Sequence, residues 1–452
     1  MTVSKSSLSS ARGGTSSEWS IARDRRLEAT FDDDSLVANA GLIVPATLTV
    51  RLGVEALVNR TVRLVGRVGG ARPGRKVCSL VATILAGGSH IDHADMLRAG
   101  ATQRVLPFRV MAPSTLGTFL RAFTFGHVRQ LDAVIAETLR RAWSLGAGPG
   151  ARRLVIDVDS TICEVVGKRK QGAGYGYTHV LGYHPIVATR AETGEVLHAR
   201  MRKGQANTSR GARRFIEELV ARVRRAGATG EIVLRVDSGF WSKDTIATLG
   251  RLGVRYTMAV RTGNPAIARV IAAIDEAAWV DIDYTPDGEA QVAECTYRGR
   301  RLIVRRTRLT DTTQAQLWPD WRHHAFLTDL DDDPVTIDAF HRHHAVVELA
   351  IRDLKEGAGL EHCPSGKFFA NAAWLACAAL AHNLIRWSAE LGDITPDDQL
   401  AVARTIRTRL VALPGRIVNR SGAHRLRLPS RWPWADLFLN ALTRLRALPQ
   451  LA

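Results

Sequence analysis

The sequence predicts a mixed α/β fold, in which a sheet is flanked by helices and interrupted by a β-rich insertion. Between about 151 and 278, short apolar runs alternate with amphipathic helical stretches. From 279 to 332 the apolar residues recur at every second position instead. An all-α region precedes this part of the chain, and an Arg-rich segment follows it.

The charge of the chain indicates a polyanionic partner. The sequence has 62 Lys and Arg against 44 Asp and Glu, a net charge of +18. Residues 401–452 contain ten Arg, no Lys and one acid, Asp436, so half of the excess lies in this segment. A uniform compositional bias would not concentrate charge in this way, which favours nucleic-acid binding.

Other features of the composition exclude several classes of protein. The five cysteines are scattered without a CxxC pair, which argues against a disulfide framework or a zinc ribbon and fits a reducing cytoplasm. The N-terminus has no apolar core typical of a secretory signal. The apolar run 372–385 contains His382 and Asn383 and is too short for a bilayer, so we predict a buried helix and no membrane partner.

These patterns divide the chain into six segments. We predict a flexible N-terminal segment (1–40), a helical DNA-binding domain (41–150), two parts of one α/β core (151–278 and 333–395), the β-rich insertion between them (279–332) and an Arg-rich DNA-contacting segment (396–452). In the helical domain, Ser114 or Thr115 is placed to cap a helix over 112–123. With an earlier short helix (91–99), it fits either a helix-turn-helix or an ordinary helical pair.

The elements of the core follow in order. We predict a strand at 153–159, two strands in the Gly-rich stretch up to residue 190, a helix opened by Thr208 or Ser209, a strand at 231–239, a helix capped by Ser242, a strand at 254–261 and a helix over 265–278. After the insertion, a single helix is predicted from Thr336 or Asp338 to a stop at Gly357.

Three acids stand out by their positions. Asp159 and Asp237 each end an apolar strand, where ligands bind in α/β sheets, and Glu348 lies on the helix after the insertion. On that helix, one polar stripe is predicted to carry His341, His344, Glu348, Arg352 and Lys355. Carboxylates without thiolates suit Mg²⁺, and two such ions can clamp a phosphoryl displacement.

At these residues the sequence resembles the group-1 DDE transposases of bacterial insertion sequences, which have an RNase H-like catalytic core. The similar stretches are DVDST (157–161), GYGYTHVLGYHPIVA (174–188), LRVDSGF (234–240), VELAIRDLKEG (347–357) and ANAAWLACAALAHNLIRW (370–387). The family's Glu-x6-Lys spacing is kept by Glu348 and Lys355, whereas His341 and His344 occupy the Tyr and Arg positions of its signature.

The resemblance implies a site and a reaction. Asp159, Asp237 and Glu348 would be catalytic and hold two Mg²⁺ ions, for which Mn²⁺ can substitute, with Asp157 supporting them from the same face of its strand. DNA phosphates would be bound by a basic set of residues: Lys355, Arg352, His344 and Arg342. A homodimer or higher synaptic complex would bind the terminal inverted repeats of its element, cut them and join them to target DNA, in the bacterial cytoplasm at the nucleoid.

Two other interpretations use the same residues. Asp157, Asp159 and Thr161 also match the Asp-x-Asp-x-Thr motif of haloacid dehalogenase-like phosphatases, in which Asp157 would be the nucleophile and Asp159 the acid/base. LTDLDDD (327–333) would then supply later metal-binding acids. A catalytically silent, transposase-derived DNA-binding protein is the other alternative.

Overall fold

The structure is a computed structural model that describes residues 29–176, 179–284, 288–309, 321–394 and 402–452. The chain divides into two units, Met1–Asp34 and Ser35–Ala452, and the second contains all the elements described below. The flexible segment predicted for 1–40 falls mainly on residues 1–28, which lie outside the described residues.

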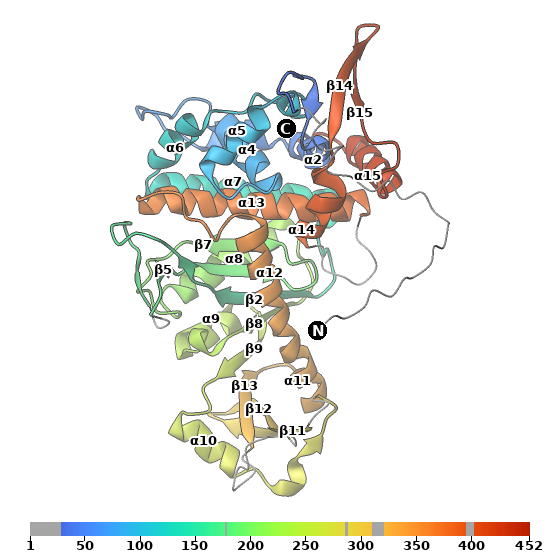
Figure 1. Cartoon of the computed structure of the whole chain (residues 1–452). Coiled ribbons are helices and arrows are strands. Elements are labelled where there is room, and N and C mark those ends of the chain that lie inside the picture. Colours follow the sequence, from blue (N-terminus) through green and yellow to red (C-terminus); the bar gives the residue numbers. More distant parts are fainter. Residues whose placement is uncertain (1–28, 177–178, 285–287, 310–320, 395–401) are drawn as a thin grey trace, which may run out of the picture. The chain divides into compact units, whose positions relative to one another are not determined.

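The second unit is built around a nine-stranded mixed sheet (Figure 1). Its five core strands are β2 (Leu154–Ser160), β6 (Ile186–Arg190), β7 (Val196–Arg200), β8 (Ile232–Val236) and β9 (Arg255–Val260). They lie in the order β7-β6-β2-β8-β9. β2, β8 and β9 are parallel, and β6 is antiparallel to both of its neighbours. This arrangement is that of an RNase H-like core and confirms the predicted fold class.

The predicted start is correct for one helix of the core and wrong for another. α9 (Lys243–Arg251) is capped by Ser242 as expected, because its Oγ accepts a hydrogen bond from the Thr245 amide at 3.0 Å. α8 (Ala212–Ala226) begins after Gly211, so the prediction of Thr208 or Ser209 was wrong. Ser209 instead bonds back to the Asn207 side chain through its amide and hydroxyl, at 3.0 and 3.1 Å, which makes a local turn before the helix.

The Gly-rich stretch before β6 forms more strands than predicted. A separate small sheet contains β3 (Cys163–Glu164), β5 (Leu181–Tyr183) and β4 (Gly174–Tyr175). The core strand β7 was not predicted at all. Its edge position and its mixture of apolar, His and Arg residues give a weak alternation signal.

The β-rich insertion continues the core sheet. After α10 (Pro265–Ala272) and a 3₁₀ turn (Glu276–Ala278), the chain forms β10 (Val280–Asp281), β11 (Gly288–Tyr297), β12 (Arg300–Leu309) and β13 (Arg322–Thr328). β13 pairs antiparallel with β9, with Ala325 opposite Val260. A cluster of buried apolar side chains that includes Val233, Ile303 and Phe326 joins core and insertion. The insertion and the core therefore share one sheet.

The regular elements of the region 41–150 are helices joined by loops, as predicted. Its main helices are α2 (Ile43–Arg51), α3 (Val54–Thr61), α4 (Pro73–Leu85), α5 (Ala94–Arg98), α6 (Pro113–Arg121) and α7 (Phe125–Ala142). α6 begins after Ala112 with Pro113 in its first turn, so the predicted cap at Ser114 or Thr115 was wrong. Pro is favourable there because its amide lacks the hydrogen that would need a partner. Residues 99–112 separate α5 from α6, which is too long for a helix-turn-helix, so the ordinary helical pair holds.

Helix α13 (Phe368–Gly392) lies between the N-terminal helices and the sheet (Figure 1). The helix extends beyond the predicted run 372–385 to 25 residues, and by length and composition alone it could cross a membrane. Its apolar window is 83% buried inside the protein, and the predicted buried helix is confirmed. The bent pair Ala40–Arg51 and Val54–Thr61 passes the same length test.

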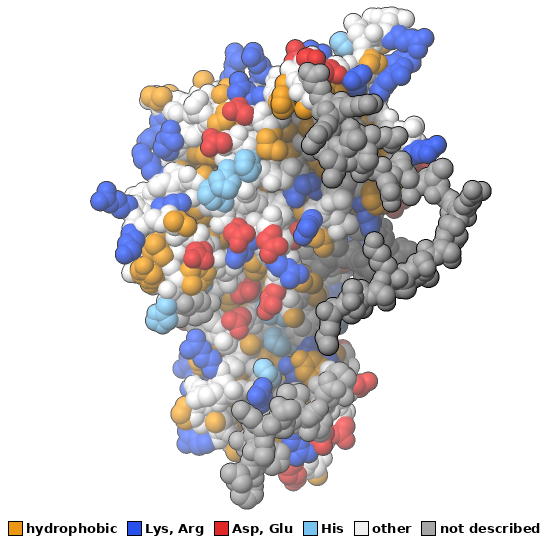
Figure 2. Space-filling view, in the orientation of Figure 1, with side chains coloured by type: hydrophobic (Ala, Val, Ile, Leu, Met, Phe, Trp, Pro, Cys, Tyr) orange, Lys and Arg blue, Asp and Glu red, His pale blue; other side chains and the backbone are white. Residues whose placement is uncertain are grey.

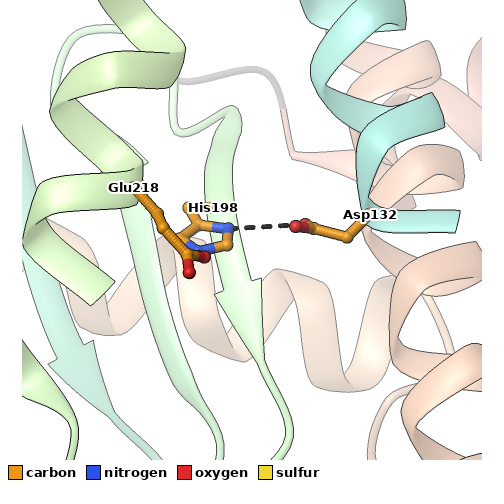
Figure 3. A group of neighbouring side chains, drawn as sticks. All are labelled: Asp132, His198 and Glu218. Carbon is orange, nitrogen blue, oxygen red and sulfur yellow. Dashed lines mark ion pairs between the residues drawn. The ribbon is translucent and has the colours of Figure 1, made fainter. Parts of the chain in front are cut away.

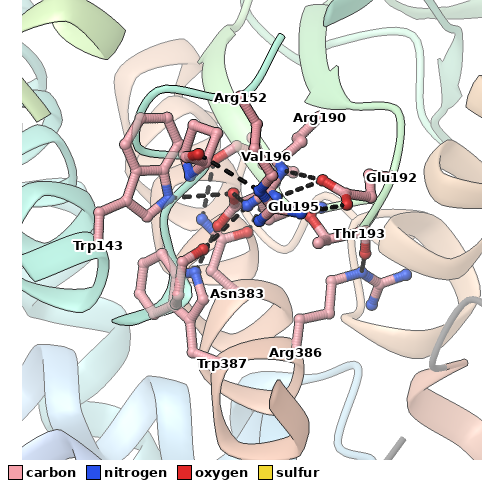
Figure 4. A network of polar contacts seen from close by, with 12 residues as sticks. Trp143, Arg152, Arg190, Glu192, Thr193, Glu195, Val196, Asn383, Arg386 and Trp387 are labelled. Atoms are coloured by element: carbon pink, nitrogen blue, oxygen red, sulfur yellow. Dashed lines mark hydrogen bonds and ion pairs between the residues drawn. The ribbon is translucent and has the colours of Figure 1, made fainter. Parts of the chain in front are cut away.

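A buried polar network fixes α13 to the sheet (Figure 4). Glu195 accepts hydrogen bonds from the indole nitrogens of Trp143, at 3.0 Å, and Trp387. The Asn383 side chain bonds the Val196 amide and carbonyl at 2.7 and 2.8 Å. Burial raises the pKa of Glu195, while Arg190 opposes the shift. Each of these buried groups has partners, so the network sets the position of β7 against α13.

The helix after the insertion is broken into four short pieces. They are α11 (Pro334–Arg342), a 3₁₀ turn (His343–Ala345), α12 (Val346–Arg352) and a π turn (Asp353–Gly357). α11 is capped by Asp333, earlier than the predicted start. A 3₁₀ turn rotates each residue by about 120° instead of the 100° of an α-helix, so α12 is rotated by about 60° from its position in a continuous helix.

The C-terminal part returns to the helical region. It contains α14 (Ala403–Ile406), a two-stranded ribbon of β14 (Gly415–Arg420) and β15 (Ala423–Arg427), and α15 (Ala435–Ala447). α15 buries Phe438, Ala441 and Leu445 and packs on α2 and α13. β14 also pairs with β1 (Leu36–Val37).

Candidate active site

Asp159 and Asp237 lie side by side at the carboxyl ends of two parallel strands. β2 and β8 pair with Val158 opposite Val236, so the next residue on each strand is one of the two acids. Neighbouring strands lie about 4.8 Å apart. Each carboxylate accepts a hydrogen bond at 2.6 Å from the following amide, of Ser160 and of Ser238 respectively. These short contacts leave the second oxygen of each carboxylate available to a ligand.

Glu348 reaches the same region from the broken helix. It lies on α12, which packs on β2 and β6, and its side chain is exposed. The charges of Asp237 and Glu348 affect the pKa of Asp159. Burial, with smaller contributions from the charges of Asp237 and Glu348, raises the pKa of Asp159 to about 6, against the opposing effects of the Ser160 amide and His344.

Asp157 forms a buried ion pair with Arg235. Its carboxylate is 0% exposed and is held by two hydrogen bonds from Arg235, from Nε at 2.7 Å and from NH2 at 2.8 Å. His344 Nδ1 lies 2.7 Å from the same carboxylate. Arg235 also donates to the Phe340 carbonyl at 2.7 Å. The pair therefore ties β2 and β8 to the end of α11 and the start of α12.

These contacts count against the phosphatase interpretation. Its nucleophile would be Asp157, which has no exposed oxygen and whose two oxygens are already bonded to a guanidinium. A nucleophile must reach its substrate, and an anion paired with Arg is a poor one. Sequence analysis missed Arg235, although a charged residue inside the apolar run of β8 is a signal that could have found it.

The basic residues predicted on the helix lie in different surroundings. Arg342 donates to buried Asp338 at 2.9 Å and lies over the Tyr284 ring. Arg352 is exposed, on the wall of a cavity of about 730 Å³ between α12 and α14. Lys355 is half-buried, and its positive charge opposes the raised pKa of the Cys163 thiol. These positions place Arg342 in a structural ion pair and leave Arg352 and Lys355 nearer to solvent.

His341 lies beside His344 as the predicted stripe requires, with the ring centroids 6.2 Å apart, but it is buried at the junction with the insertion. Its Nδ1 is 2.7 Å from the Thr257 hydroxyl, and its ring stacks on Phe326 with centroids 4.1 Å apart. Burial lowers the pKa of His341 well below its usual value. The contacts with Thr257 of β9 and Phe326 of β13 therefore place His341 at the junction between the core and the insertion.

Comparison with known families assigns the chain. The family model described as "Transposase DDE domain group 1" matches residues 19–450. The chain is a DDE transposase. No curated protein matches it. One similar solved structure is the cryo-EM structure of a piggyBac transposase synaptic complex with hairpin DNA, with 13% sequence identity, coverage of 82% of this chain and 79% of that one, and a TM-score of 0.46.

DDE transposases are polynucleotidyl-transferase enzymes that generally use divalent metal ions, and the strand-end acids fit such ions. Asp159 and Asp237 at neighbouring strand ends and Glu348 on α12 offer the hard oxygen donors that Mg²⁺ prefers, although among the described residues these three acids do not form a group whose ligand atoms all lie within 4.8 Å of one another. Asp159, Asp237 and Glu348 would hold the ions. The charge of a bound cation would oppose the effects of burial and of the neighbouring acids, which raise the Asp159 pKa.

A second acidic group has a different role. Among the described residues, Asp132 (α7), His198 (β7) and Glu218 (α8) bring ligand atoms within 4.8 Å of one another (Figure 3). His198 is buried, with each ring nitrogen 3.5 Å from one of the carboxylates. Sequence analysis missed this group, because its members come from three elements far apart in the chain.

Arginine side chains already bind the carboxylates of this group. All four carboxylate oxygens accept hydrogen bonds from guanidinium groups, which belong to Arg129, Arg200, Arg214 and Arg222. Burial would raise the pKa of Asp132, but contacts with His198 and Arg222 outweigh it and hold that pKa well below its usual value. Four nearby positive charges oppose a cation, so the group is an ion-pair network that joins α7, α8 and the sheet.

Replacing Asp159 by Asn is expected to stabilise the metal-free protein. The folded pKa of about 6 lies above the ordinary 3.8, so the ionised carboxylate destabilises the fold fully above pH 6 and ceases to do so below about pH 4. At pH 7.5 in EDTA the free energy of unfolding should rise by roughly 1 to 3 kcal/mol in the variant. Denaturant unfolding checks this.

The same unfolding measurement is repeated with Mg²⁺ and with a control variant at an exposed aspartate. Mg²⁺ should raise the stability of the wild type and not of Asp159→Asn, because only the wild type keeps the ligand. Asp92→Asn, at an exposed position, should respond to Mg²⁺ as the wild type does. A metal-free Asp159→Asn protein that is less stable than the wild type would contradict the crowding of the three carboxylates.

Proposed function

We propose that this transposase binds the terminal inverted repeats of an insertion sequence, cuts the DNA strands at their ends and transfers them to a target. The observation that carries the proposal is the register of β2 and β8, which puts Asp159 and Asp237 next to each other at the sheet edge. The charge of Glu348, on α12, raises the pKa of Asp159.

Each residue of the site has a role in this proposal. Asp159, Asp237 and Glu348 hold two divalent ions. When bound, these ions would activate water or a 3′-hydroxyl and stabilise charge on the attacking and leaving oxygens. The pair of Asp157 and Arg235, with His344, holds the strand ends and α12 in position. Lys355 and Arg352 contribute positive charge for the phosphates of the bound strand.

Metal-dependent cleavage of a DNA end tests the proposal. Purified full-length protein is incubated with a labelled duplex that ends in the repeat of its element, in Mg²⁺, Mn²⁺ or EDTA. We expect nicks at the edge of the repeat in Mg²⁺ and in Mn²⁺, and intact DNA in EDTA. Intact DNA with every divalent ion, or cleavage that persists in EDTA, would overturn it.

The assembly and the cell compartment follow from the same proposal. A mobile element has two ends, so we propose that a homodimer or larger complex of this chain joins them on the DNA, in the bacterial cytoplasm at the nucleoid. The mass of the complex on paired repeats, measured by light scattering, should correspond to two or more copies of the chain. A single copy at saturating protein would contradict this.

A further inference from the structure

The C-terminal ribbon is a two-stranded antiparallel hairpin with a two-residue turn. Arg420 pairs with Ala423, and Ser421 and Gly422 between them have φ values of 53° and 76°. Positive φ at both central residues is the geometry of a type I′ turn, which matches the right-handed twist of the strands. Figure 1 shows the ribbon projecting from the helical region beyond α2 and α15.

The pairing of the ribbon separates its side chains by type. Residues directly opposite each other in an antiparallel pair lie on the same face, and faces alternate along each strand. Arg416 is opposite Arg427, Val418 is opposite Arg425, and Arg420 is opposite Ala423. All four arginines of the ribbon therefore share one face, which we call the arginine face (Arg416, Arg420, Arg425 and Arg427), and all four are exposed.

The opposite face of the ribbon attaches it to the protein. Ile417 is opposite Leu426, and both are half-buried against the core. The Ile417 amide donates to the Ser35 carbonyl at 2.9 Å, and β1 extends the pairing. At the base, Trp432 donates to the Arg409 carbonyl at 2.9 Å. The arginine face is thus held outward by a packed base.

The basic C-terminal segment is not uniformly available to a ligand. Arg407 is half-buried and donates to the carbonyls of Leu85 and Gly357, and Arg444 pairs with Asp393 at 2.7 Å. The ribbon and its turn, residues 415–427, contain no acid. Blue side chains accordingly gather on the projecting ribbon in Figure 2. The arginine face brings together four of the exposed arginines of the segment, whereas Arg404, Arg431, Arg444 and Arg446 are exposed at separate places.

We propose that the arginine face contacts the phosphates of duplex DNA outside the cleavage site. Alternate residues on a strand are about 6.6 Å apart, close to the rise of two nucleotides along one DNA strand, about 6.8 Å. A two-stranded ribbon also fits the major groove, whose edges are lined by phosphates. The inference rests on the function proposed above and assigns it a second DNA contact. Figure 1 shows the ribbon well apart from α12.

The test compares two variants with the same loss of charge. The ribbon variant carries Arg416→Gln, Arg420→Gln, Arg425→Gln and Arg427→Gln. The control variant carries Arg98→Gln, Arg140→Gln, Arg152→Gln and Arg251→Gln, at positions whose side chains are 40–62% exposed and paired with acids. Binding to a duplex of about 40 base pairs is measured by fluorescence anisotropy over a range of salt concentrations.

We expect the ribbon variant to bind the duplex at least about tenfold more weakly near 0.15 M salt, with the slope of log K against log salt reduced by about 3 to 4. The control variant should keep the slope of the wild type. Cleavage of the repeat end at saturating DNA should be unchanged in the ribbon variant, because the arginine face lies away from the three acids.

Three results would overturn the inference. The first is a ribbon variant with wild-type affinity and slope. The second is an equal loss in the control variant, which would make the effect one of net charge alone. The third is a ribbon variant that loses binding to anionic phosphatidylserine vesicles but not to duplex DNA. In each case, Mg²⁺-dependent cleavage by the wild type leaves the proposed function standing, so the two failures are distinguishable.

Discussion

Replacing Glu348 by Gln is expected to lower metal-dependent cleavage of the repeat end strongly and to leave DNA binding intact. The amide keeps the size of the side chain but removes the charge that would hold a divalent ion beside Asp159. The exposure of Glu348 means that the fold loses no buried contact. A loss of about 4 kcal/mol of transition-state stabilisation corresponds to a fall of roughly 10³-fold in the rate of cleavage.

The measurement is single-turnover cleavage of labelled repeat DNA with saturating protein, alongside anisotropy for binding. Asp237→Asn should give the same result, since Asp237 ends the strand next to that of Asp159. Glu356→Gln is the matched control, because Glu356 is an exposed glutamate on the turn that directly follows α12. Wild-type cleavage by Glu348→Gln would show that this acid holds no essential ion and would remove it from the site.

Replacing Asp157 by Asn is expected to lower the free energy of unfolding by roughly 3 to 5 kcal/mol. Arg235 is only 4% exposed at its side chain, and the substitution leaves its charge buried without the carboxylate that balances it. The variant also loses the contact with His344, which joins the sheet to the start of α12. Denaturant unfolding at neutral pH measures the change.

A double variant distinguishes the loss of the ion pair from the cost of leaving the Arg235 charge buried without a partner. Asp157→Leu with Arg235→Met removes both ions and fills the space with apolar groups, so it should recover at least half of the stability lost by Asp157→Asn. The opposite pattern, with full stability in Asp157→Asn and complete loss of activity, would assign a chemical role to Asp157. That is what the phosphatase interpretation requires.

Several features of the fold follow from local patterns in the sequence. The apolar runs of β2 and β8 end at the acids because strand length and polarity are encoded in neighbouring residues. The cap of α9 at Ser242 is local in the same sense. Where competing local signals exist, prediction failed: Pro113 set the start of α6, and the turn made by Asn207 and Ser209 delayed α8.

The site depended on contacts that no local pattern contains. A single continuous helix was predicted for 336–357, but Asp157 and Arg235 hold the chain at Phe340 and His344, where it forms a 3₁₀ turn. His341 lies in the junction with the insertion, in contact with Thr257 and Phe326. The group of Asp132, His198 and Glu218 was missed because its members meet only after α7, α8 and β7 pack together.

The sequence by itself determined the strand-end positions of Asp159 and Asp237, the helical location of Glu348 and the basic charge of the C-terminal segment. The tertiary structure alone decided the register that puts the two aspartates side by side, the commitment of Asp157 to Arg235, and the collection of four arginines on one face of the ribbon. The physical reason is that strand polarity and charge are properties of neighbouring residues, whereas pairing register and buried ion pairs are set by residues far apart in the chain.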